Sequence, residues 1–217
     1  MIFAFSGIDC AGKSTQIARL DEQLQRLGHR TEVVWFRPGY SDLLNGARAA
    51  VRRLRPGALP TVKDAKARDA AFAKPEVRRA WVTMALGDSL LQYAGRVRAL
   101  SLSGRVVLCD RYLDDALLDV RFRFPELDVA RWPVTRALKA LAPTPARSFV
   151  LTLPHDEMLR RMVIKDEPFP DPPSIRDRRF DAYLRMASRP GFVAIDASPD
   201  IETVHRTLLA HTAAALG

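Results

Sequence analysis

Residues 6–15 read Ser-Gly-Ile-Asp-Cys-Ala-Gly-Lys-Ser-Thr, and this stretch decides the fold. Its spacing G-x-x-x-x-G-K-S lets backbone N–H groups turn toward phosphate oxygens. The Lys13 ammonium suits the β- and γ-phosphates, and the Ser14 hydroxyl suits Mg²⁺. An apolar run precedes the motif and a helical pattern follows it, which is the context that a phosphate-binding loop requires. We therefore predict nucleotide contacts from Gly7, Asp9, Cys10, Ala11, Gly12, Lys13, Ser14 and Thr15.

The composition is that of an ordinary globular protein. The chain has 217 residues, 47% of them hydrophobic, and no linker or repeat divides it, so we expect one domain over residues 1–217. No apolar run approaches the roughly 20 residues of a membrane span. Because the first residues already read as a strand, we expect no signal peptide and a cytoplasmic location.

A net charge of +9 favours anionic partners. The arginines are spread over the whole chain, and neither zinc-finger spacing, an RNP-type aromatic motif nor a basic tail occurs. Nucleotide phosphates explain this charge at least as well as nucleic acid does. We expect a small-molecule acceptor, no nucleic acid and no membrane as partners.

Apolar runs alternate with helical patterns along the chain, which predicts an α/β fold with a parallel sheet covered on both faces. The strands are expected at residues 1–5, 31–36, 105–109, 147–153 and 192–196. The longest helical pattern covers residues 75–102. Its expected apolar face consists of Trp81, Met84, Leu91, Tyr93, Val97 and Leu100.

Charged residues follow two of the predicted strands, at the edge where α/β sheets hold ligands. Asp110, in the triplet Asp-Arg-Tyr, is placed to hold Mg²⁺, generally through a water, and Arg111 to face the phosphates. Arg37 follows the second strand. It is either a clamp on the acceptor phosphate or a solvated arginine, and the sequence favours neither.

Residues 163–175 are polar and proline-rich, and cationic residues flank them. This composition is typical of a mobile lid that carries arginines over a transferring phosphoryl group, and the alternative is a charged surface helix. We expect the lid at about residues 160–180, with a cationic cluster acting from it that consists of Arg160, Arg161, Lys165, Arg176, Arg178 and Arg179. The two cysteines, Cys10 and Cys109, both follow core strands, so a redox switch between them is a second, less favoured hypothesis.

In four stretches the chain resembles the thymidylate kinase group of P-loop nucleoside monophosphate kinases. The stretches are residues 5–16, 110–112, 151–154 and 192–198, in the order of the family. The resemblance implies a three-layer P-loop kinase fold with a five-stranded parallel sheet, helices on both faces and a lid. It also implies ATP and Mg²⁺ as cofactors, and a homodimer. Asp9 would then contact the sugar of the acceptor, while Arg37 and Arg111 would hold its phosphate. From the lid, the resemblance implies a role for Arg176, Arg178 or Arg179.

The chain departs from that family mainly where the base is read. Ser6 stands where the family usually has Glu. On the central helix, Ala85 and Ser89 stand where the family has a stacking Phe and an Arg, whereas Asp88 is kept. Asp119 and Val120 replace a Tyr-Gln pair. Tyr40, Trp81, Met84 or Tyr112 would line a different pocket.

These departures favour phosphoryl transfer to an acceptor other than dTMP. One alternative is a kinase for a non-nucleotide metabolite. Another is a nucleotide-binding switch protein, although the Asn-Lys-x-Asp motif of guanine recognition does not occur. Nucleic-acid binding through the basic surface ranks last.

Overall fold

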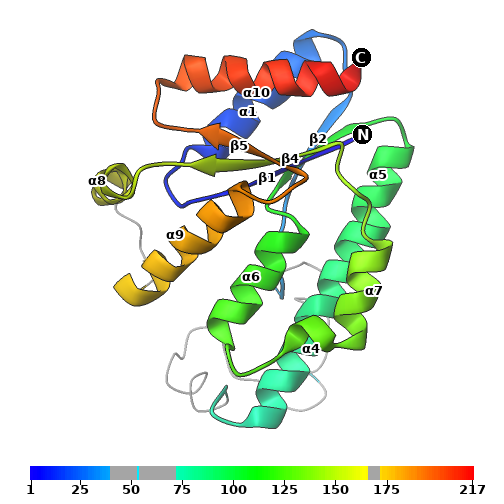
Figure 1. Ribbon diagram of the computed structural model, residues 1–217. Helices are drawn as coiled ribbons and strands as arrows, with labels where there is room; N and C mark the ends of the chain where they lie inside the picture. The colour runs from blue at the N-terminus through cyan, green and yellow to red at the C-terminus, as the bar shows by residue number, and fades with distance from the viewer. Residues whose placement is uncertain (40–52, 54–71, 166–171) are drawn as a thin grey trace. The chain divides into compact units, whose positions relative to one another are not determined.

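The computed structural model describes residues 1–39, 53, 72–165 and 172–217 (Figure 1). The described chain forms two units, each with its own interior. We call the first, Met1–Trp35 with Val97–Asp115 and Pro143–Gly217, the sheet unit. The second, Phe36–Arg96 with Ala116–Ala142, is the helical unit.

Five parallel strands form the sheet in the order β2-β3-β1-β4-β5. They are β1 (Ile2–Gly7), β2 (Thr31–Trp35), β3 (Val106–Asp110), β4 (Arg147–Thr152) and β5 (Phe192–Asp196). All five predicted strands are confirmed. Asp110 is in register with Phe5 on one side and Trp35 on the other, so the carboxyl ends of β1, β2 and β3 meet at one edge.

Burial of the strands follows their place in the sheet. All of β1 is buried, and β3 is buried up to Cys109, because central parallel strands are covered on both faces. The edge strands β2 and β5 bury only one residue each, Val34 and Ile195.

Helices cover both faces of the sheet (Figure 1). On one face α1 (Lys13–Arg26) packs against α10 (Ile201–Leu216), whose first turn is capped by the Asp200 carboxylate. On the other face α9 (Pro173–Ala187) packs against β4 and β5. The short helix α5 (Arg98–Leu102) packs against β3, and α8 (His155–Lys165) follows β4. The predicted α/β fold of the P-loop kinase type is therefore confirmed.

The helical unit is built around α4 (Pro75–Leu90), which packs on α7 (Pro133–Leu141). The 3₁₀ turn η2 (Val129–Arg131) precedes α7, and α6 (Leu113–Arg123) runs from the sheet unit into this one. Between α4 and α5 the helix takes π geometry, η1 (Leu91–Val97).

The predicted helix over residues 75–102 is confirmed as a continuous helical segment, but its predicted apolar face is wrong in part. Leu91 is 58% exposed, and the buried apolar residues of α4 are Val82, Ala85 and Leu86. The predicted Tyr93 and Val97 are buried, whereas Trp81 and Met84 are half-buried.

Several predictions concern residues outside the described ones. They are Tyr40, as a candidate for the acceptor pocket, and residues 166–171 of the lid. Within the described part of the chain, no helix is both long enough and apolar enough to cross a membrane.

Candidate functional site

The loop between β1 and α1 has the backbone geometry that the motif predicts. Gly7 has a φ of 140°, and a Cβ there would lie 2.2 Å from the carbonyl oxygen of Leu151 on β4. Only glycine fits so close an approach. Gly12, with a φ of 78°, caps the start of α1, so the first N–H groups of this helix open onto the loop. Cys10 also has a positive φ of 62°, a conformation that side chains rarely adopt outside functional loops.

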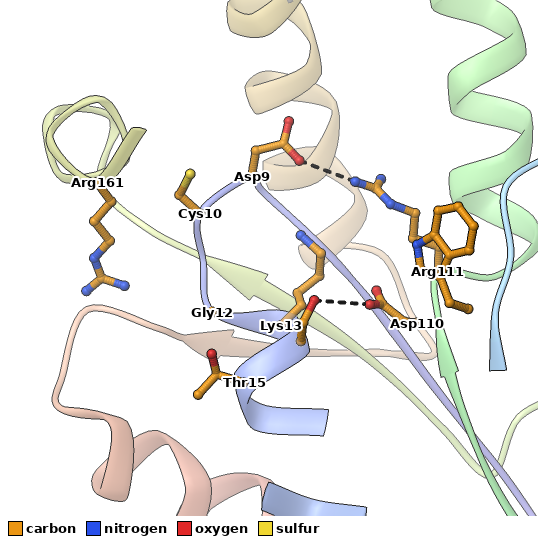
Figure 2. Close-up of a pocket in the computed structure, with 10 residues that line it drawn as sticks. Asp9, Cys10, Gly12, Lys13, Thr15, Asp110, Arg111 and Arg161 are labelled. Atoms are coloured by element: carbon orange, nitrogen blue, oxygen red, sulfur yellow. Dashed lines mark hydrogen bonds and ion pairs between the residues drawn. The ribbon is translucent and has the colours of Figure 1, made fainter. Parts of the chain in front are cut away.

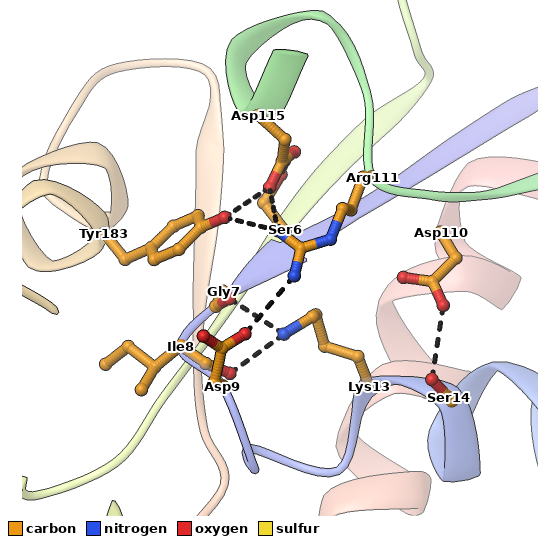
Figure 3. A network of polar contacts seen from close by, with 10 residues as sticks. All are labelled: Ser6, Gly7, Ile8, Asp9, Lys13, Ser14, Asp110, Arg111, Asp115 and Tyr183. Carbon is orange, nitrogen blue, oxygen red and sulfur yellow. Dashed lines mark hydrogen bonds and ion pairs between the residues drawn. The ribbon is translucent and has the colours of Figure 1, made fainter. Parts of the chain in front are cut away.

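Lys13 lies inside this loop, and only 8% of its surface is exposed. Its Nζ donates hydrogen bonds to the carbonyl oxygens of Gly7 at 2.8 Å and Ile8 at 2.9 Å (Figure 3). Burial, and then the nearby positive charge of Arg111, lowers the pKa of the Lys13 ammonium to about 8. An anionic ligand in the loop would favour the charged form again.

Ser14 and Asp110 form a pair of hard oxygen ligands. The Ser14 hydroxyl donates to the Asp110 carboxylate at 3.2 Å, from the start of α1 to the end of β3. A hydroxyl and one carboxylate, completed by phosphate oxygens and waters, fit Mg²⁺ and its usual ligands. Among the described residues there is no group of three or more His, Cys, Asp or Glu side chains that could hold a metal ion.

Arg111 follows Asp110 and enters the pocket with a φ of 75°. Its Nη2 lies 3.3 Å from the Asp9 carboxylate in the phosphate-binding loop. Its Nη1 donates to the Tyr183 hydroxyl at 2.9 Å, and α9 supplies this tyrosine. Residues 9 and 111, which the sequence assigns to the acceptor, are thus brought together.

A buried carboxylate, that of Asp115, lies next to the Arg111 guanidinium (Figure 3). It accepts hydrogen bonds from Ser6 Oγ at 2.5 Å, Tyr183 OH at 2.8 Å and the Tyr112 backbone N–H at 3.0 Å. Burial raises the pKa of the Asp115 carboxyl, and the charge of Arg111 opposes this shift. Sequence reasoning missed Asp115 and Tyr183, because no local pattern links positions 6, 111, 115 and 183.

These elements enclose one polar pocket in the sheet unit (Figure 2). Arg161 of α8 and Arg111 lie on opposite sides of the phosphate-binding loop, with Lys13 between them. Trp35, 59% exposed at the end of β2, adds an apolar wall. The pocket is lined by Asp9, Cys10, Gly12, Lys13, Ser14, Thr15, Trp35, Asp110, Arg111 and Arg161. Three cations in such a pocket suit a polyphosphate.

The arginines predicted to act from a lid lie on the first turns of α9, because this helix begins at Pro173. Residues 163–165 and 173–175 are helical, and the lid expected at about residues 160–180 stays a prediction. Arg176 Nε contacts Asp177 at 3.0 Å, and His155 Nε2 contacts the same carboxylate at 3.2 Å. Arg178 and Arg179 follow on the same helix, and the described pocket is not lined by any of the three. Instead Arg161 reaches it, while also donating to Glu157 at 2.6 Å.

Three residues assigned to the acceptor are not in this pocket. The Tyr112 side chain is buried and its hydroxyl donates to the Pro143 carbonyl at 2.6 Å, away from the phosphate-binding loop. Arg37 and Asp88 belong to the helical unit, where Arg37 is exposed and Asp88 is only 4% exposed. Their assignments stay predictions.

The positions on α4 where a base would be read are tightly packed. Ala85 and Ser89 are fully buried, and the Ser89 hydroxyl donates to the Ala85 carbonyl at 2.9 Å. A Cβ on Gly39 would lie 2.9 Å from the Trp81 indole and 3.6 Å from Ala85. Trp81 also packs against Phe72 and Phe124. Trp81 and Ala85 thus both lie close to Gly39, and Trp81 is held among aromatic rings.

The redox hypothesis gains nothing from the structure. Neither cysteine is in a disulfide, and Cys109 is fully buried in register with Ala4, six residues before Cys10. Burial raises the pKa of the Cys109 thiol to about 12, so the reactive thiolate is scarce at neutral pH.

Comparisons with known proteins agree with the geometry of this site. The thymidylate kinase of Desulfovibrio desulfuricans is 33% identical over 117 residues, which are 54% of this chain and 46% of that enzyme. Over these residues the chain is similar to a thymidylate kinase. The thymidylate kinase of Syntrophotalea carbinolica is 29% identical over 161 residues, 73% of this chain and 64% of that enzyme. The matches thus cover less than two thirds of either relative's length, and no protein-family model matches the chain.

Proposed function

We propose that the chain transfers the γ-phosphoryl group of ATP to a nucleoside monophosphate, with Mg²⁺ as cofactor. The observation that carries this proposal is one pocket lined by three cations, Lys13, Arg111 and Arg161. The Ser14–Asp110 pair lines the same pocket. The similarity to two thymidylate kinases supports the same reaction.

Each residue has a role that its position supports. The loop amides and Lys13 bind the phosphates of ATP, and the Lys13 ammonium exchanges its two carbonyl partners for phosphate oxygens. Ser14 and Asp110 would hold Mg²⁺, which neutralises charge on the transferred group when it is bound. Arg111 orients the phosphate of the acceptor, and Asp9 fixes this arginine and contacts the sugar.

Charge on the transferred phosphoryl group needs cations on its open side. Arg161 is the described arginine of the α8–α9 region that lines the pocket, so we assign it this role ahead of Arg176, Arg178 and Arg179. Those three arginines remain candidates for a lid that closes over bound nucleotide. A homodimer also remains a prediction, which analytical ultracentrifugation would test.

The acceptor is the part of the proposal that departs from the relatives. The small, fully buried side chains of Ala85 and Ser89 support a base site unlike one that stacks thymine on a phenylalanine. The same observation favours, as a second candidate, phosphoryl transfer to a non-nucleotide metabolite.

The test is a panel of acceptors with ATP, Mg²⁺ and the purified protein, followed by ³¹P NMR. The panel holds the common ribo- and deoxyribonucleoside monophosphates, and phosphorylated and hydroxylated metabolites. We expect ADP and one nucleoside diphosphate to appear, with dTMP a poor acceptor. Efficient turnover of dTMP alone would contradict an altered base site. Turnover of none of them, with tight Mg-ATP binding, would favour a nucleotide-dependent switch instead.

A further inference from the structure

Arg111 is held in an uncommon backbone conformation. Its φ of 75° lies in the left-handed region, which a residue with a long side chain adopts only where its surroundings hold it there. The Arg111 backbone N–H donates to the Phe5 carbonyl at 2.9 Å, which anchors the turn to β1. This bond fixes the backbone and leaves the direction of the guanidinium to other groups.

The side-chain contacts of Arg111 lead inward to one buried carboxylate. Its Nη1 donates to Tyr183 OH at 2.9 Å, and this hydroxyl donates in turn to Asp115 Oδ1 at 2.8 Å. Arg111 Nη1 itself lies 3.8 Å from Asp115 Oδ1. A guanidinium only donates and an ionised carboxylate only accepts, so the hydroxyl between them has a single possible orientation.

The carboxylate at the end of this chain of bonds is fixed from three elements. Ser6 donates to it from β1, the Tyr112 N–H donates from the turn after β3, and Tyr183 donates from α9. The Asp115 side chain is 1% exposed and the Tyr183 side chain is fully buried, so water does not compete for these bonds. The Asp115 carboxylate is therefore held in one orientation by its three hydrogen-bond donors.

We propose that Asp115, with Ser6 and Tyr183, is a positioning residue that aims the Arg111 guanidinium into the phosphate pocket. This inference rests on the proposed function, in which Arg111 orients the acceptor. It extends that function to residues that touch neither ATP nor acceptor. It also links the pocket to α9, since Tyr183 lies one to two turns after Arg176, Arg178 and Arg179 on that helix.

The experiment compares Tyr183→Phe, Asp115→Asn and Ser6→Ala with the wild-type protein. Tyr183→Phe keeps the ring and removes only the hydroxyl between Arg111 and Asp115. We expect the KM for the acceptor to rise about tenfold, the effect of one hydrogen bond to a charged group, with the KM for ATP unchanged. Asp114→Asn is the matched control, because Asp114 neighbours Asp115 but pairs with the exposed Arg189.

A second readout needs no enzymatic activity. The side-chain Nε–Hε resonance of Arg111 in ¹⁵N NMR, assigned by its loss in Arg111→Lys, reports whether the guanidinium is held. We expect it to broaden or shift in Tyr183→Phe and Asp115→Asn and to stay unchanged in Asp114→Asn. If no acceptor is turned over, the proposed function fails and this readout alone decides the positioning role.

An unchanged Arg111 resonance in Tyr183→Phe would overturn the proposal, whatever happens to stability. Equal increases in KM for ATP and for the acceptor would overturn it too, since they would indicate general damage to the pocket. If Asp115→Asn does not fold, Tyr183→Phe and Ser6→Ala decide the question, because each removes one hydroxyl and leaves the carboxylate in place.

Discussion

The pocket edge of the sheet unit and the α4 positions of the helical unit use their polar residues in opposite ways. At the sheet edge, side chains from β1, β3, α6 and α9 contact one another in a connected network around Arg111. On α4, the Ser89 hydroxyl bonds within its own helix, and Ala85 offers no group to a ligand. The difference is that the proposed phosphate site depends on contacts between residues far apart in the chain, whereas the α4 positions depend on contacts within one helix.

The largest expected effect is on catalysis, when a cation is removed from the proposed phosphate site. Lys13→Ala should lower the turnover number by about 10³-fold or more, because the ammonium that neutralises the phosphates is lost. A steady-state assay with saturating ATP and acceptor measures this loss, with circular dichroism to check the fold. Lys139→Ala, on the exposed face of α7, is the control. Near-normal turnover in Lys13→Ala would contradict the assignment of this loop to phosphate binding in the reaction.

A smaller effect is expected at the metal ligands. Asp110→Asn keeps the shape of the side chain and removes its charge, so the Mg²⁺ concentration for half-maximal rate should rise about 10- to 100-fold. A Mg²⁺ titration of the rate measures it. Asp128→Asn, at an exposed aspartate paired with Arg131, should leave the titration unchanged. If Asp110→Asn also left it unchanged, Asp110 would have no role at the metal.

In the helical unit, an aromatic ring introduced at position 85 of α4 tests how tightly this position is packed. Ala85→Phe should lower the free energy of unfolding by about 1–3 kcal/mol, since Ala85 is fully buried close to the Gly39 backbone. Chemical denaturation measures this change, and Ala80→Phe at an exposed position of α4 should be nearly neutral. Unchanged stability together with faster turnover of dTMP would show that Ala85 borders an open base site.

The smallest expected effect concerns pH. Burial raises the pKa of Asp115 in the folded protein above its value of 3.8 in the unfolded chain. Between these two pKa values the folded state holds a proton that the unfolded state lacks, so the contribution of Asp115 to the free energy of unfolding falls as pH rises. Asp177, Asp196 and Asp200 have lowered pKa values and contribute in the opposite direction, so the test compares variants with the wild-type protein. The Asp115 slope is at most about 1.4 kcal/mol per pH unit. It should be lost from the total in Asp115→Asn and retained in Asp114→Asn, and urea denaturation upward from pH 4 tests this.

The sequence predicts the elements better than the contacts between them. Apolar runs identify all five strands, and the glycine spacing identifies the phosphate-binding loop, because both patterns are local. Asp115 could not be found this way, since its donors Ser6 and Tyr183 lie 109 and 68 residues away in the chain.

Two further differences concern helices. On α4 the buried apolar residues are Val82, Ala85 and Leu86, next to the predicted Trp81 and Met84, which are half-buried. Pro173, in the proline-rich stretch where a lid is predicted, begins α9, since proline suits the first helical position.

The sequence places Arg161 among the cations beside the predicted lid. Its place in the pocket depends on the position of α8, which no local pattern gives.

Binding of Mg-ATP to the loop between β1 and α1 tests the central claim most directly. Isothermal titration calorimetry at pH 7 should show one site on the wild-type protein, with the same affinity in Lys139→Ala and binding at least tenfold weaker in Lys13→Ala. No heat of binding to folded wild-type protein at millimolar Mg-ATP would contradict the claim, as would equal affinity in Lys13→Ala.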